Sequence, residues 1–69
     1  MIKVAIGELN GVTNFINSVA HRVDVKDIRR ALNQNFGRKV KLEFNEEEGM
    51  HYFVFETRDI LTEFLLRYA

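Results

Sequence analysis

The sequence predicts a small α+β domain, in the order β-α-α-β-β-α, in which helices pack on a three-stranded, mainly antiparallel sheet. The main observation is that the spacing of apolar residues changes along the chain. It switches between a period of two, which is typical of strands, and the three- and four-residue spacing of amphipathic helices. No repeat or low-complexity linker divides the 69 residues, so we expect a single domain over residues 1–69.

The first third of the chain predicts one strand and one helix. Ile2, Val4 and Ile6 alternate with more exposed positions, which indicates a short strand that ends at the glycines of residues 7–11. A helical stripe of apolar residues follows and comprises Val12, Phe15, Ile16, Val19, Ala20 and Val23.

A second helix is predicted over residues 25–36. Asp24 is a favourable N-cap, and Gly37 stands where a helix commonly ends in a glycine. The expected buried face comprises Val25, Ile28, Ala31, Leu32 and Phe36.

The last third predicts a hairpin and a final helix. Val40, Leu42 and Phe44 alternate with charged residues, and the polar turn 45–49 leads to a strand over residues 50–56. Thr57 then caps a helix with an apolar stripe of Ile60, Leu61, Phe64, Leu65 and Tyr68.

The strand over residues 50–56 is apolar on both faces, which favours a central position in the sheet. Tyr52 lies on one face, while Phe53 and Phe55 lie on the other. Two arrangements remain open. All three helices could cover one face, leaving either Tyr52 or the phenylalanine pair exposed beside the residues Lys3, Ala5, Lys39 and Lys41. Alternatively, one helix could cover each face, so that neither face is left exposed.

The net charge of zero hides a strong asymmetry along the chain. Residues 21–41 carry a formal charge of +5, whereas residues 42–69 carry −5. This separation suggests a charged macromolecular partner, although the two segments could also neutralise each other within one molecule.

The basic segment predicts a nucleic-acid-contacting surface, because Arg and Lys attract phosphates while Asn, Gln and Arg can hydrogen-bond base edges. On the helix 25–36, several polar residues lie outside the apolar stripe at three- and four-residue spacings. The candidate residues, including those that follow the helix, are Lys26, Arg29, Arg30, Asn33, Gln34, Arg38, Lys39 and Lys41.

Two helices joined by a tight turn and followed by a hairpin resemble the topology of a winged helix-turn-helix domain over about two thirds of the chain. The resemblance implies that residues 25–36 form the recognition helix and that the turn 45–49 is the wing tip. The sequence departs from the pattern in two ways. Three glutamates stand at the wing tip, where a phosphate backbone would repel them, and no helix precedes the first strand.

A protein-protein interaction module, such as an inhibitor or adaptor, is the alternative function. Its candidate interface comprises Tyr52, Phe53, Phe55, Glu46, Glu47 and Glu48. Opposite charges on one molecule could also pair across a two-fold axis, which allows a homodimer. Tyr52 with Lys3 and Lys41 could instead form a platform for single-stranded RNA.

Catalysis is not expected from this sequence. Cysteine is absent, and the two histidines, His21 and His51, lie on different elements without metal-ligand spacing. Ser18 stands three residues before His21, but nothing supplies an oxyanion hole. We therefore expect a non-enzymatic binding protein with no cofactor and no bound metal. No apolar run is long enough to span a bilayer and no signal-peptide pattern is present, which favours a cytoplasmic protein without membrane contact.

Overall fold

The computed structural model describes residues 1–19 and 24–69. Predictions for Ala20, His21 and Val23 lie outside the described residues. The elements follow the predicted order, with one addition, a short 3₁₀ helix, η1, between the second helix and the hairpin. Their bounds are β1 (Ile2–Ala5), α1 (Asn10–Val19), α2 (Val25–Phe36), η1 (Gly37–Lys39), β2 (Val40–Asn45), β3 (Met50–Phe55) and α3 (Arg58–Tyr68).

The three strands form an antiparallel sheet in the order β1-β3-β2, so the predicted central position of the 50–56 strand is confirmed. The register places Phe53 between Val4 and Leu42. Val54 lies between Lys3 and Lys41. Because side chains alternate along each strand, these two rows of residues lie on opposite faces of the sheet.

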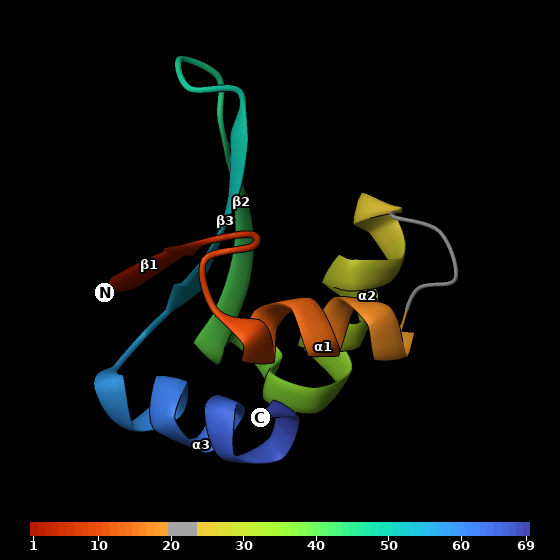
Figure 1. Ribbon diagram of the computed structural model, residues 1–69, viewed down its shortest axis with the longest axis vertical. Helices are drawn as coiled ribbons and strands as arrows, with labels where there is room; N and C mark the ends of the chain where they lie inside the picture. The colour runs from red at the N-terminus through yellow and green to blue at the C-terminus, as the bar shows by residue number, and fades with distance from the viewer. Residues whose placement is uncertain (20–23) are drawn as a thin grey trace.

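All three helices pack on one face of the sheet (Figure 1). The row that contains Phe53 belongs to the same apolar cluster as residues of α1, α2 and α3. The first of the two arrangements is therefore the observed one, and Tyr52 rather than the phenylalanine pair lies on the face that no described helix covers. That helix-free face carries Lys3, Ala5, Lys41, Glu43, Tyr52 and Val54.

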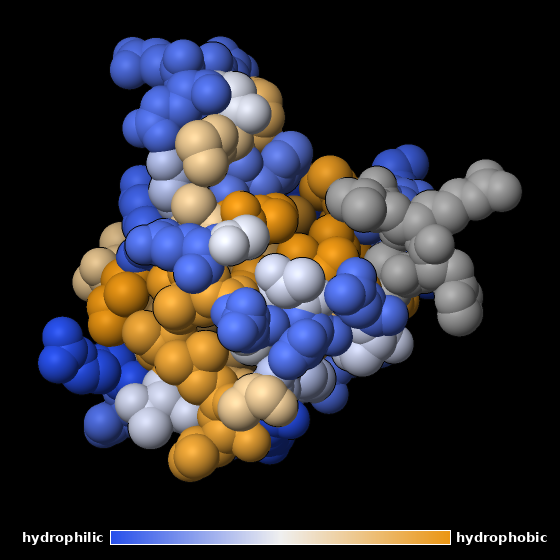
Figure 2. Space-filling model, viewed as in Figure 1, coloured by the Kyte–Doolittle hydropathy of each residue, from blue (hydrophilic) through white to orange (hydrophobic). Residues whose placement is uncertain are grey.

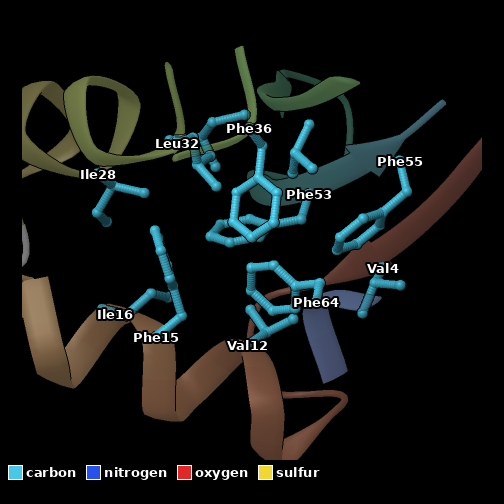
Figure 3. Packing of buried hydrophobic residues seen from close by; sticks show 12 residues of the cluster. Val4, Val12, Phe15, Ile16, Ile28, Leu32, Phe36, Phe53, Phe55 and Phe64 are labelled. Carbon is cyan, nitrogen blue, oxygen red and sulfur yellow. The ribbon is translucent and has the colours of Figure 1, made fainter. Parts of the chain in front are cut away.

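Phe64 of α3 lies at the centre of the core (Figure 3). Its ring centroid lies 5.3 Å from that of Phe15, 5.4 Å from that of Phe36 and 5.2 Å from that of Phe55. These four rings come from α1, α2, β3 and α3, so the C-terminal helix is an integral part of the core.

The boundaries of α2 and α3 follow from local chemistry. The Asp24 carboxylate accepts a hydrogen bond from the Lys26 N–H at 2.9 Å, and the Thr57 hydroxyl accepts one from Ile60 at 3.3 Å. Both bonds satisfy amides that a helix N-terminus leaves without partners. At the end of α2, Gly37 adopts a φ of 60°, which allows its N–H to bond the Asn33 carbonyl.

The β2–β3 hairpin extends beyond the helices, and its turn forms a hydrophilic tip (Figures 1 and 2). The Gly49 N–H donates to the Asn45 carbonyl at 2.8 Å, with Gly49 at a φ of 67°. The Asn45 side chain accepts a further bond from the Glu48 N–H at 3.1 Å. These bonds fix a turn that holds three carboxylates away from the helical layer.

Candidate nucleic-acid interface

The buried stripe of α2 determines which of its residues face solvent. Ile28 and Leu32 are each only 1% exposed, because they pack into the core. The polar residues between them consequently point outward, as the helical period requires. All eight candidate residues are exposed, namely Lys26, Arg29, Arg30, Asn33, Gln34, Arg38, Lys39 and Lys41.

The structure brings four of these candidates together around a hollow of about 250 Å³ between α2 and β2. The four polar residues at this hollow are Arg29, Asn33, Arg38 and Lys41. Its apolar lining comes from Leu32, Val40 and Leu42, with Gly37 at the joint. No carboxylate lines it, and three cations, Arg29, Arg38 and Lys41, converge there. We call this feature the α2–β2 hollow.

The other candidates are spread over different sides of the molecule. Arg30 and Gln34 line a second hollow, where Asp27 supplies a negative charge. Lys39 lies in a third hollow, which it shares with Arg38, Lys41 and Glu56. Lys26 is exposed near the start of α2 and lines none of these three hollows. The predicted basic surface is thus divided, with its most positive part at the α2–β2 hollow.

The acidic third of the chain does not neutralise the basic segment through ion pairs between described residues. Those residues form two ion pairs, Lys3–Glu43 at 3.7 Å and Glu63–Arg67 at 3.4 Å, and neither involves a cation from the segment 26–41. Strand β2 separates only the three glutamates of the tip from η1, whereas Glu56 of the same acidic third shares a hollow with Arg38 and Lys39. The six extended residues of β2 span roughly 20 Å. The tip glutamates therefore lie about two Debye lengths from η1 at physiological salt, where the attraction between exposed charges is largely screened.

The candidate protein interface is also divided by the structure. Phe53 and Phe55 are 0% exposed, because both side chains face the helices, and a partner cannot reach them in this fold. Tyr52 lies on the helix-free face, beside a hollow of about 620 Å³ that the three glutamates of the tip help to line. The candidate residues that remain accessible are therefore Tyr52, Glu46, Glu47 and Glu48.

Tyr52 is coupled to the tip by a hydrogen bond from its hydroxyl to the Glu48 carboxylate. This bond raises the pKa of Tyr52 above its ordinary value of 10.0, and partial desolvation and the negative charges of Glu48 and Glu8 raise the pKa further. The neutral phenol is therefore the form that this arrangement stabilises.

Sequence reasoning missed the exposure of Phe44. The alternating pattern of β2 indicates that Phe44 points to the same side as Val40 and Leu42, and it does, yet Phe44 is 49% exposed. Near its turn the hairpin extends beyond the helices (Figure 1), and the Phe44 ring lies 4.7 Å from the ring of His51, measured between centroids. The position of Phe44 next to the turn 45–49 is the sequence feature that could have indicated its exposure.

No group of three His, Cys, Asp or Glu side chains among the described residues could hold a metal ion. The Ser18 hydroxyl donates to the Phe15 carbonyl at 2.8 Å, which is a local bond within α1. Within residues 1–19 and 24–69, no helix has the length and apolar character needed to cross a bilayer.

Comparison with known proteins gives no match: no family model fits the chain, and neither a curated protein nor a solved structure is significantly similar to it.

Proposed function

We propose that this protein binds nucleic acid through the outer face of α2 and the residues 38–41 that follow it. The observation that carries the proposal is the convergence of Arg29, Arg38 and Lys41 around one hollow whose lining contains no carboxylate. Phosphate contacts by such cations supply most of the affinity of a nucleic-acid-binding protein.

The arrangement offers both kinds of contact that nucleic-acid recognition requires. The guanidinium groups of Arg29 and Arg38 suit phosphate oxygens, whereas the amide of Asn33 can pair with an adenine edge. Helix α2 has 12 residues and is roughly 18 Å long, and an exposed helix of this kind fits the major groove of a DNA duplex. Duplex DNA is therefore the first ligand to test.

The element order adds support, because it resembles that of a winged helix-turn-helix domain with α2 as the recognition helix. Helix α3 packs against α1 and places Phe64 in the core. The hairpin does not fit the role of a wing, since Glu46, Glu47 and Glu48 would be repelled by phosphates. The proposed contact therefore involves α2 and η1 and leaves the tip outside.

The test compares two variants that each lose one exposed arginine. Arg38→Ala removes a cation from the α2–β2 hollow, whereas Arg58→Ala removes one from the start of α3, where Arg58 lines none of the four hollows described above. Fluorescence anisotropy measures the affinity of each variant for a labelled 20-base-pair duplex and for single-stranded DNA and RNA.

We expect Arg38→Ala to weaken binding and to reduce the slope of log affinity against log salt by about 0.9, because one phosphate contact is lost. Arg58→Ala should keep the affinity and the salt slope of the parent protein. Equal losses in the two variants, or no binding of any probe at low salt, would contradict the proposed surface. Circular dichroism verifies that both variants remain folded.

A further inference from the structure

The outer edge of β2 has an unpaired backbone. The Lys39 carbonyl accepts a hydrogen bond from the Glu56 N–H, which assigns Lys39, Lys41 and Glu43 to the positions that bond with β3. Because hydrogen-bonding positions alternate in an antiparallel ladder, Val40, Leu42 and Phe44 direct their N–H and C=O groups away from the sheet. None of the turn, loop or side-chain hydrogen bonds among the described residues involves these groups.

The edge of β1 differs, because the following residues of the chain bond the backbone of Ala5 there. The Ala5 N–H donates to the Glu8 carboxylate at 3.0 Å, and the Ala5 carbonyl accepts from the Glu8 N–H at the same distance. Strand β1 is also short, at four residues against six for β2. The β2 edge is therefore the part of the sheet that is available for another strand.

We propose that two copies of this chain pair through β2, antiparallel and centred on Leu42, to form one sheet that continues through both copies. In this register Leu42 faces Leu42 of the second copy and Val40 faces Phe44 of the second copy. All of these are outward-bonding positions, so the pairing forms about six backbone hydrogen bonds.

Charge favours this register over its neighbours. Centring on Leu42 places Lys41 opposite Glu43 of the second copy, and by symmetry it forms that pair twice without a like-charge contact. The register centred on Lys41 pairs Lys39 with Glu43 twice but also brings two lysines together on the two-fold axis, and the register centred on Glu43 brings two glutamates together there. Opposite charges across strands stabilise a sheet, whereas like charges directly opposite destabilise it.

The half-exposed Phe44 and the α2–β2 hollow provide the second argument. Directly opposite residues lie on the same face of a continuous sheet, so Phe44 of the second copy lies on the helix side beside Val40. Leu32, Val40 and Leu42 line the α2–β2 hollow there, and phosphate binding does not account for this apolar lining. The Phe44 ring, which is 49% exposed, and the apolar lining of the α2–β2 hollow therefore lie next to each other in the proposed dimer. Because both are apolar, this contact removes apolar surface from water.

This inference rests on strand geometry and is independent of the proposed nucleic-acid function. The two-fold axis places both α2 helices on the same side of the joint sheet, with their outer faces outside the strand pairing. Both proposals use Lys41 and the α2–β2 hollow: Phe44 of the second copy lies against its apolar lining, whereas its polar residues Arg29, Asn33 and Arg38 take no part in the strand pairing.

The experiment is a charge exchange followed by sedimentation equilibrium over a range of concentrations. The parent chain is expected to shift from 8.1 kDa toward twice that mass as concentration rises. Lys41→Glu and Glu43→Lys each create two like-charge contacts and should each weaken the dimer by about tenfold. The double exchange restores the opposite pairs and should recover most of the affinity. Lys39→Glu is the control, because Lys39 faces the uncharged Asn45 of the second copy.

Amide hydrogen exchange gives a second readout that needs no variant. As concentration rises, exchange should slow at Val40, Leu42 and Phe44, while Lys41 and Glu43 are already bonded to β3 and should change little. A chain that stays monomeric at all concentrations would overturn the proposal. So would a dimer that the single exchanges leave intact, or one that protects residues elsewhere and not the β2 edge.

Discussion

Replacing Phe64 by alanine should remove much of the free energy of unfolding. The Phe64 side chain is 0% exposed and contacts rings from three other elements, so truncation leaves a large cavity in the only core that the described residues share. Phe→Ala changes at such sites cost about 3–5 kcal/mol. A domain of 69 residues has roughly 3–10 kcal/mol of stability in total. We therefore expect Phe64→Ala to be barely folded or unfolded.

Urea denaturation followed by circular dichroism measures this loss, and two variants on the same helix calibrate it. Phe64→Leu keeps most of the volume and should cost about 1–1.5 kcal/mol, which lowers the Tm by roughly 4–12 °C. Leu66→Ala is the surface control, because Leu66 is 80% exposed, and its effect should stay within about 0.5 kcal/mol. If Phe64→Ala and Leu66→Ala were equally stable, α3 would not be part of the core.

Three further predictions test local features of the chain. The hydrogen bond to Glu48 raises the pKa of Tyr52, so the stability that it contributes is present at neutral pH and is lost as the pH rises through the raised pKa. In ultraviolet titrations Glu48→Ala should bring the pKa of Tyr52 back toward 10.0, and an unchanged titration would exclude the contact. Asp24→Ala removes the cap of α2 and should cost about 0.5–2 kcal/mol in thermal denaturation, whereas an unchanged Tm would show that the cap is dispensable. A Cβ at Gly11 would lie 2.7 Å from the Leu65 Cδ2 atom, so Gly11→Leu should cost about 1–3 kcal/mol, and equal or higher stability would show that α1 and α3 do not pack closely there.

The sheet order could be predicted because one strand carries a distinctive signal. Both faces of β3 are apolar, and a strand that is buried on both sides belongs in the centre. The choice of face for the helices could not be predicted, since Val54 and Phe53 are equally compatible with packing against a helix. Only the register shows that Val54, 3% exposed, lies between Lys3 and Lys41 on the helix-free side.

The sequence predicts which exposed residues belong to the candidate site, but it does not predict how they are grouped on the surface. Helical spacing correctly places Arg29 and Arg30 outside the apolar stripe, yet consecutive residues differ by about 100° around a helix and so face different neighbours. Arg29 faces β2, whereas Arg30 lies near Asp27. Arg38 lies in η1 and lines the same hollow as Arg29, and the sequence predicts no helical turn at that position.

The central claim is that the cations around the α2–β2 hollow bind phosphates, and the salt dependence of duplex binding tests it most directly. If Arg29, Arg38 and Lys41 each displace a counterion, a plot of log affinity against log salt should fall with a slope of about −2.7. An affinity that does not change with salt, or the absence of binding at the lowest salt concentration, would contradict the account.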